Sequence, residues 1–355
     1  MGTEAQSPRL WTRVQGAGRD TTVMNVPVTF PPDRGPTRMV SGFLSPSVEK
    51  AAVPESFAEE LQALDYRIDV NAKLGHEANK TAFVEDAHKT LERRFEAFQS
   101  VLDRDDWDLF FGVFMTTDRV NHFLFRDYEH DGDNREAFLE FYEKVDEYIG
   151  EIRASLPDDV TLVVASDHGF TSLEYEVHCN AWLEEEGWLA YEDDEHDELG
   201  DISGDTRAYS FIPGRFYINL DGREPDGAVP ESEYDAVRSE LKADLEALVG
   251  PDGRPVADRV VETEDAFRGD HDEIAPDLVV VPNHGFDLKS GFKSHDDVFG
   301  TGPRNGMHSF DNATLFIDDD DATIEGADLY DIAPTILELM EIDYDRTDFD
   351  GASLL

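Results

Sequence analysis

Three short stretches of the sequence bring together residue types that bind metal ions. "TTDRVNHF" carries Asp118 and His122 four residues apart, "VVASDHGF" carries the adjacent Asp167 and His168, and "GMHSFDNATLFI" carries His308. Carboxylate oxygens and imidazole nitrogens suit Zn²⁺, and also Mn²⁺ or iron. Each stretch alone is weak evidence, because a neighbouring Asp and His more often form an ordinary loop hydrogen bond. Together they predict a metal site.

The first two stretches directly follow apolar runs that are typical of buried strands. Ligands of open α/β sheets bind at the carboxyl ends of the parallel strands, where such residues would meet. If a helix begins after Met115, Asp118 and His122 lie on one face of it. The predicted strands cover residues 21–30, 107–115, 161–167, 276–282 and 313–318.

Helical patterns alternate with these strands. Apolar residues recur every three or four positions over 82–102 and 134–153, and an amphipathic helix is expected over 328–342, with Pro334 as a possible kink. The runs at 107–115, 161–167 and 276–282 are almost continuously apolar, as in parallel strands covered on both faces. The predicted fold class is therefore α/β, with a parallel-sheet core and helices on both faces.

We expect one α/β domain over residues 1–355, with a cap or insertion within it at approximately 171–270. The inserted stretch is aromatic, acidic and rich in turn residues, unlike the strand and helix alternation around it. No repeat with a period of 20–50 residues is visible.

The charge balance excludes some partners. Acidic residues number 80 against 30 basic ones, giving a net charge of −50, and the acids are spread along the chain. Such a field repels nucleic acid and anionic membranes. Distributed acid around a substantial core indicates adaptation to a very salty cytoplasm, where salt screens the self-repulsion, and predicts unfolding at low salt.

The chain has a single cysteine, Cys179, so an internal disulfide is excluded and a reducing compartment is favoured. The amino-terminal stretch is polar and lacks a signal sequence, and the apolar run "LFFGVFM" is too short to cross a bilayer. These features predict a cytoplasmic protein that does not enter the membrane.

The three metal-type stretches, in this order, resemble the alkaline phosphatase superfamily. The most similar branch is that of type I phosphodiesterases/nucleotide pyrophosphatases, which includes phosphohydrolases and phosphomutases; "VHCNAWLEEEGWLAY" and "GRFYINLDGREPDG" add to the likeness. The resemblance implies a metal-dependent phosphoric ester hydrolase that acts on a small-molecule phosphate ester. It also implies two divalent ions, Zn or Mn, one held by Asp118, His122 and His308 and the other by Asp167 and His168.

The sequence departs from the family pattern at its start. That pattern opens with a strand ending in a metal-binding Asp, followed by a Ser or Thr nucleophile, and neither has a counterpart here. Thr29 in "NVPVTFPP" is the nearest hydroxyl, but its stretch resembles a later family segment. We therefore expect an N-terminally incomplete form that holds at most one metal tightly, and we assign no catalytic residue. A start placed too late, a truncated gene and a complementing partner chain all remain open, as do activity in this form and the oligomeric state.

Three further residues are candidates for substrate binding. His178 and Asn180 in "EVHCNAW" follow the Asp-His pair, and Arg215 has a guanidinium suited to a phosphate. A helix-start role for the first two and a structural ion pair for Arg215 are the competing interpretations. For the whole chain, the alternatives to phosphate ester hydrolysis are sulfate ester hydrolysis, phosphomutase action, or a non-catalytic metal-binding or partner-binding protein.

Overall fold

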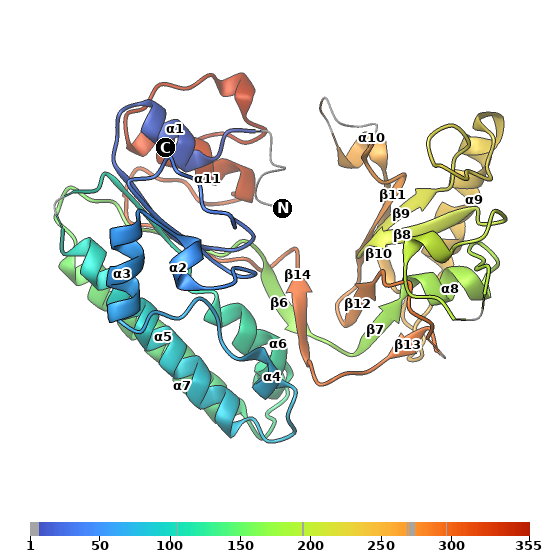
Figure 1. Cartoon of the computed structure of the whole chain (residues 1–355), viewed down its shortest axis with the longest axis horizontal. Coiled ribbons are helices and arrows are strands. Elements are labelled where there is room, and N and C mark those ends of the chain that lie inside the picture. Colours follow the sequence, from blue (N-terminus) through green and yellow to red (C-terminus); the bar gives the residue numbers. More distant parts are fainter. Residues whose placement is uncertain (1–6, 105, 194, 268, 270–273, 296) are drawn as a thin grey trace. The chain divides into compact units, whose positions relative to one another are not determined.

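The computed structural model describes the chain except residues 1–6, 105, 194, 268, 270–273 and 296, and it divides into two compact units (Figure 1). Unit 1 comprises Met1–Phe170 and His308–Leu355, and unit 2 comprises Thr171–Met307. The cap was expected at approximately 171–270, of which residues 194, 268 and 270 lie outside the described part. Unit 2 begins at Thr171, where the cap was expected to begin, and it extends beyond the expected end to Met307.

The main sheet of unit 1 has the strand order β3-β2-β1-β4. Its central strand β1 (Thr21–Val26) runs parallel to both β2 (Arg38–Ser41) and β4 (Leu109–Gly112), whereas β3 (Ala52–Val53) is antiparallel to β2. The parallel core expected from the apolar runs is therefore confirmed for the strands within 21–30 and 107–115.

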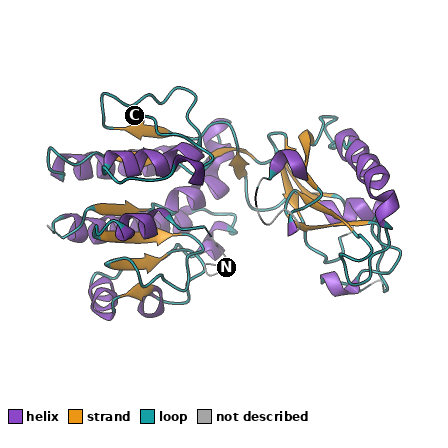
Figure 2. Cartoon of the chain, turned by 90° about the horizontal axis from the view of Figure 1, so that it is seen from above, coloured by secondary structure: helices purple, strands orange, loops and turns teal. Residues whose placement is uncertain are grey.

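Successive residues of a strand point to opposite sides of the sheet, so this sheet has apolar side chains on both faces. Helices cover both faces. Val23 and Met39 pack with Trp11 of α1 (Leu10–Gly16) on one face. Met24 and Val40 pack on the other face. There they meet α3 (Glu55–Ala63) and α5 (Thr81–Leu102), and Figure 2 shows helices on either side of the strands.

A second apolar cluster joins three helices of unit 1. Phe83, Leu91 and Phe95 of α5 pack against α6 (Thr116–Glu129) and α7 (Arg135–Ser155). α5 and α7 confirm the helices expected over 82–102 and 134–153. α2 (Val48–Ala51) and α4 (Ala72–Gly75) are single turns.

The predicted kink at Pro334 is wrong, because the chain changes helix type before it. A short 3₁₀ turn (Leu329–Asp331) precedes α11 (Ile332–Leu339), so Pro334 is the third residue of the α-helix. Backbone N–H groups in the first turn have no partner within the helix, so proline costs nothing there. A further 3₁₀ turn spans Arg346–Asp348.

Two short pairs of strands complete this part of the fold. β5 (Val163–Ala165) pairs antiparallel with β15 (Leu315–Ile317) in unit 1, so the expectation of a parallel strand at 161–167 is wrong for the pairing of the described strands. β6 (Gly169–Ser172) pairs with β14 (Gly306–Ser309), and these two strands carry the chain into unit 2 and back.

Unit 2 has its own core, which includes Trp182, Trp188, Phe216 and Phe286. Two sheets surround it, with strand orders β10-β11-β9-β8 and β12-β7-β13. The strands are β7 (Tyr175–His178), β8 (Ala208–Ile212), β9 (Arg215–Ile218), β10 (Ala257–Glu262), β11 (Leu278–Pro282), β12 (Phe286–Lys289) and β13 (Phe299–Gly300). The helices are α8 (Cys179–Glu185), α9 (Tyr234–Ala247) and α10 (Thr263–Ala266), with 3₁₀ turns at Leu199–Asp201 and Glu231–Glu233.

The expectation of a parallel strand at 276–282 is wrong. β11 is antiparallel to both β10 and β9, and it belongs to unit 2 rather than to the parallel core. Leu278 and Val280 are buried, while Val279 and Val281 are only half-buried. A continuous apolar run indicates cover on both faces, but it does not encode the direction of the neighbouring strands.

Across the described residues, no helix has both the length and the apolar character needed to cross a membrane.

Candidate metal centre

Asp118 lies in the first turn of α6, just beyond the carboxyl end of β4. A helix N-terminus favours a negative charge at this position. His122 follows one turn later on the same helix face, with its Nε2 3.5 Å from Asp118 Oδ1. The four-residue spacing therefore places both side chains together, as the sequence indicates.

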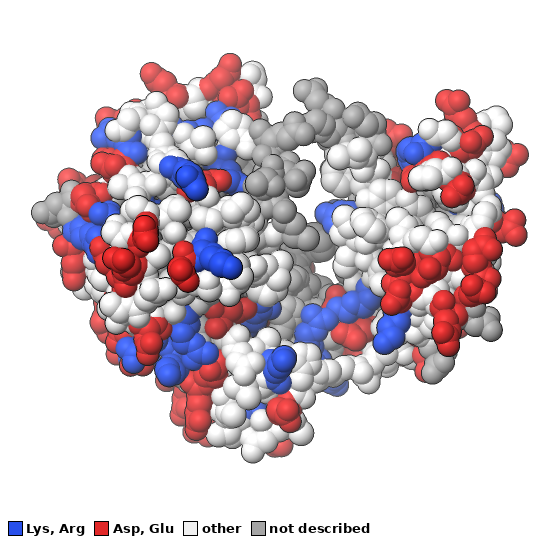
Figure 3. Space-filling view, viewed as in Figure 1, with Lys and Arg blue, Asp and Glu red and all other residues white. Residues whose placement is uncertain are grey.

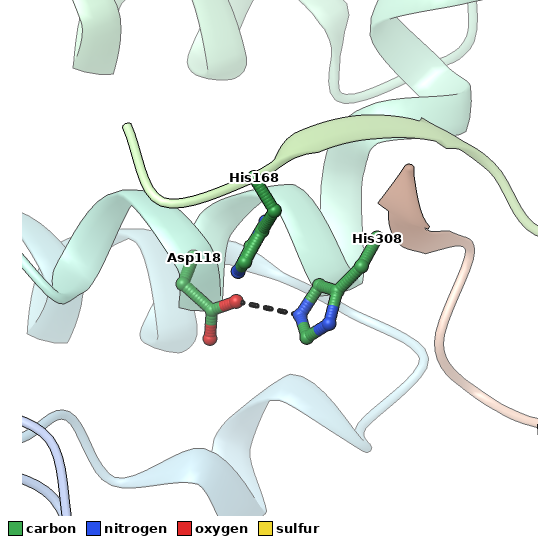
Figure 4. Close-up of side chains that lie close together, drawn as sticks. All are labelled: Asp118, His168 and His308. Atoms are coloured by element: carbon green, nitrogen blue, oxygen red, sulfur yellow. Dashed lines mark hydrogen bonds and ion pairs between the residues drawn. The ribbon is translucent and has the colours of Figure 1, made fainter. Parts of the chain in front are cut away.

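His168 and His308 reach the same place from neighbouring strands (Figure 4). His168 immediately precedes β6, and His308 is in β14. His308 Nε2 donates to Asp118 Oδ1 at 3.1 Å, and the His168 and His308 rings are stacked with their centroids 3.9 Å apart. Potential ligand atoms of Asp118, His168 and His308 all lie within 4.8 Å of one another. We call these residues the triad.

A close approach between the two strand segments fixes the two histidines. Gly169 follows His168 and is buried, and a Cβ added there would collide with the side-chain oxygen of Asn312. Asn312 Nδ2 donates to the carbonyl of Phe170 at 2.8 Å, and Ser309 hydrogen-bonds to Asn312. Only glycine leaves room for this connection, which ties His168 to the segment that carries His308.

The surroundings of Asp118 favour its ionised form. Burial acts to raise its pKa, but the hydrogen bond from His308 and the nearby His122, His308 and Arg119 lower it more, so the net pKa lies below the usual value. Phe170 packs edge-on against His122 and His308, with ring centroids 5.0 and 5.2 Å away. The triad thus combines a carboxylate with two imidazoles on an apolar base.

The triad fits a divalent metal ion in chemistry and in spacing. Zinc binds nitrogen and oxygen ligands at about 2.1 Å, so two of its ligands are at most about 4.2 Å apart. The observed limit of 4.8 Å requires only small side-chain rotations to reach that range. The three potential metal ligands come from α6, the β5–β6 connection and β14. The single hydrogen bond between Asp118 and His308 does not account for the presence of His168 beside them.

The grouping of residues differs from the one that the resemblance implies. His168, expected at a second metal with Asp167, lies in the same cluster as Asp118 and His308. His122 contacts Asp118 beside the triad. The Asp167 side chain is 76% exposed and lies 3.6 Å from His168 Nε2.

A network of hydrogen bonds made by Arg94 and Arg119 surrounds Asp118, and no sequence motif predicted it. Buried Arg94 of α5 donates to Thr116 Oγ1 at 3.2 Å and to the carbonyls of Arg67 and Ile68 at 3.2 and 2.7 Å. Asp69 accepts three hydrogen bonds from Arg119, the shortest being 2.7 Å. Thr116 and Arg119, which stand on either side of Asp118 in the sequence, are therefore both tied to segment 67–69. The available signal was a charged residue at position 94 on the apolar stripe of helix 82–102, three residues after Leu91.

The three expected substrate-binding residues all lie in unit 2, whereas the triad lies in unit 1. Asn180 is 2% exposed. Its Nδ2 donates to the backbone carbonyls of Ser210, Ser290 and Gly291, and its Oδ1 accepts a hydrogen bond from the Ser210 N–H. This is a structural use of the side chain. The His178 ring stacks on His295 at 3.6 Å, and burial lowers the His178 pKa. Arg215 is the first residue of β9.

The Thr29 hydroxyl and the Cys179 thiol are both buried and have structural roles. Thr29 is buried and its Oγ1 donates to the Val26 carbonyl at 2.7 Å. Burial raises the pKa of Cys179 to about 12, as expected of a structural rather than a nucleophilic cysteine.

The parallel core, the helices on both faces and a cluster of metal-type side chains beyond the strand ends define an α/β protein with an alkaline-phosphatase-like fold. The family model for type I phosphodiesterase / nucleotide pyrophosphatase matches residues 3–311, so the chain belongs to that family. This membership supports a phosphoric ester hydrolase. No curated protein matches the chain.

Proposed function

We propose that this protein hydrolyses small phosphoric esters with the help of a divalent metal ion held by the triad. The observation that carries the proposal is the convergence of Asp118, His168 and His308 within 4.8 Å in a member of a phosphodiesterase family. Zinc or manganese suits this ligand set.

Each residue of the site has a role in this proposal. Asp118 supplies a charged ligand, His168 and His308 supply imidazole nitrogens, and His122 contacts Asp118 from the same helix face. A bound ion would polarise the phosphoryl oxygen as a Lewis acid. Because the net charge of −50 repels anions, a local cation is also what would attract a phosphate ester to this protein.

The test uses His308→Ala, with His130→Ala as the matched control at the exposed end of α6. We expect wild-type protein in concentrated KCl to bind about one Mn²⁺ or Zn²⁺ by calorimetry and to hydrolyse bis-p-nitrophenyl phosphate. His308→Ala should lose metal affinity by about 100-fold or more, since it removes a direct ligand, and lose hydrolysis with it.

His130→Ala should keep both properties. Activity that survives His308→Ala would contradict the metal assignment. A wild-type protein that binds metal but hydrolyses no ester would favour a non-catalytic metal-binding or partner-binding role instead. Turnover of p-nitrophenyl sulfate in preference to the phosphate diester would favour a sulfatase, and phosphate transfer within a substrate would favour a phosphomutase.

We further infer that the protein works in concentrated salt, in the cytoplasm of a halophile. What supports this is the excess of 80 acidic over 30 basic residues together with a single cysteine, which is suited to a reducing compartment. The acidic side chains are distributed over both units on the face drawn in Figure 3, as expected of surface charge rather than of an acidic tail.

A further inference from the structure

The end of β1 and the loops that follow β1 and β2 contain non-glycine residues in the left-handed backbone region. Asn25, Val28 and Leu44 have φ values of 69°, 61° and 72°. This region is costly for most side chains, and especially for a β-branched one such as valine. Strain of this kind tends to persist where a site needs it.

Asn25 has a structural explanation. It is fully buried, lies 3.1 Å from the Tyr66 hydroxyl, and can direct its amide oxygen toward Arg94 Nη2 at 2.9 Å. Asparagine also tolerates the left-handed region better than other residues do.

Val28 and Leu44 have no such explanation. Their side chains are large and apolar, yet they are 39% and 59% exposed. The loops are held against each other, since Val28 N–H donates to the Phe43 carbonyl at 3.3 Å and Gly42 N–H donates to the Val26 carbonyl at 2.9 Å. Glycine would relieve the strain, and a polar residue would suit the exposure.

A chain of contacts links these loops to the triad. The Arg119 guanidinium lies 4.3 Å from the centroid of the Phe43 ring, and Arg119 Nη1 is 3.6 Å from Asp118 Oδ2. The second loop leads into α2, where it can be followed in Figure 1. We call Val28, Phe43 and Leu44 the apolar edge.

We propose that the apolar edge binds the organic group of the phosphate ester, so that the preferred substrates carry an aromatic or branched apolar group. This inference rests on the proposed function, because the triad must hold the phosphoryl end. The charge of Arg119 is already matched by Asp69, with which it makes a 2.7 Å hydrogen bond, so the Phe43 side of the site offers apolar surface rather than a second anion site.

The test measures binding of two non-hydrolysable ligands, phenylphosphonate and methylphosphonate, to the Mn²⁺-loaded protein by calorimetry in concentrated KCl. Wild type should bind phenylphosphonate about tenfold more tightly, the effect of partly burying an aromatic ring. Val28→Gly and Leu44→Gly should each remove much of that preference and leave the methylphosphonate affinity unchanged.

The same variants should not lower the melting temperature, and Val28→Gly should raise it by about 2–4 °C because it releases left-handed strain. A residue retained for packing would give the opposite sign. Glu341→Gly is the matched control: Glu341 is exposed, has a φ of 53° and lies just after α11. It should raise the melting temperature without changing either affinity.

The proposed role of the apolar edge would be wrong if wild type bound the two phosphonates with equal affinity, or if the glycine variants kept the preference for phenylphosphonate. In either case, metal-dependent binding of methylphosphonate would still support the proposed function. If wild type bound neither phosphonate, the proposed function would itself fail and this inference with it.

Discussion

Asp118 gains its position from both of its flanks, and that position could be predicted only in part. The four-residue spacing placed it correctly beside His122. The sequence indicated that these residues meet at the strand ends, but the resemblance assigned His168 to a second metal rather than to the cluster with Asp118 and His308. The direction of its imidazole depends on the close contact of Gly169 with Asn312. Residue types therefore predict the chemistry of a site more reliably than the grouping of its ligands.

Cys179 allows a prediction at the same scale. It is 2% exposed, and burial raises its pKa to about 12, so the reactive thiolate is scarce at pH 8. We expect the folded protein to react with Ellman's reagent only through opening of unit 2, over hours or longer. The absorbance at complete reaction in guanidinium should correspond to one thiol per chain. Full labelling of folded protein within a minute would contradict the burial of this residue.

At the scale of elements, helices were easier to predict than sheet pairing. Apolar residues of an amphipathic helix recur with a local period of 3.6 residues, which can be read from the sequence. α5 and α7 therefore begin and end within two residues of the expected limits. The pairing of β11 depends on residues 215–216 and 257–262, far away in the sequence, and apolar content carries no information about them. Pro334 was misjudged because the α-helix starts later than the amphipathic pattern does.

Arg94 forms a buried polar link between α5 and the start of α6, in addition to their apolar packing. It joins Thr116 at the start of α6 to the carbonyls of Arg67 and Ile68. We expect Arg94→Met to lower the free energy of unfolding by about 2–4 kcal/mol, because it leaves buried hydrogen-bonding groups unsatisfied. It should also weaken Mn²⁺ binding about 10- to 100-fold, although it removes no ligand.

Two variants make this prediction specific. Arg93→Met changes the neighbouring arginine, which pairs with Glu96 near the surface, and should leave both quantities nearly unchanged. Thr116→Val removes only the contact with α6 and should affect Mn²⁺ affinity in the same direction as Arg94→Met. Arg94→Met protein that binds Mn²⁺ as tightly as wild type would show that α6 is positioned without this arginine.

The whole molecule carries a net charge of −50, which makes its stability depend on ionic strength. The Debye length falls from about 10 Å at 0.1 M salt to about 3 Å at 1 M, so concentrated salt screens most repulsion between surface carboxylates. We expect the melting temperature, followed by circular dichroism, to fall steadily as KCl is lowered from about 3 M to 0.1 M.

Sucrose serves as the control for this prediction, because it favours compact states by exclusion from the protein surface without screening charge. It should restore little of the stability that is lost at low KCl. A melting temperature independent of KCl, or one that sucrose fully restores, would show that repulsion among the acidic side chains does not limit stability.

The pairing of β6 with β14 has a consequence for how this fold can vary. The chain leaves unit 1 and returns to it along hydrogen-bonded neighbours, and Leu173 N–H still donates to the Asn305 carbonyl at 2.9 Å. The first and last residues of unit 2 therefore lie side by side. Residues between them can be lengthened, shortened or exchanged without rerouting the strands that carry Asp118, His168 and His308. Such an arrangement leaves one half of the molecule free to diversify while the other keeps its chemistry.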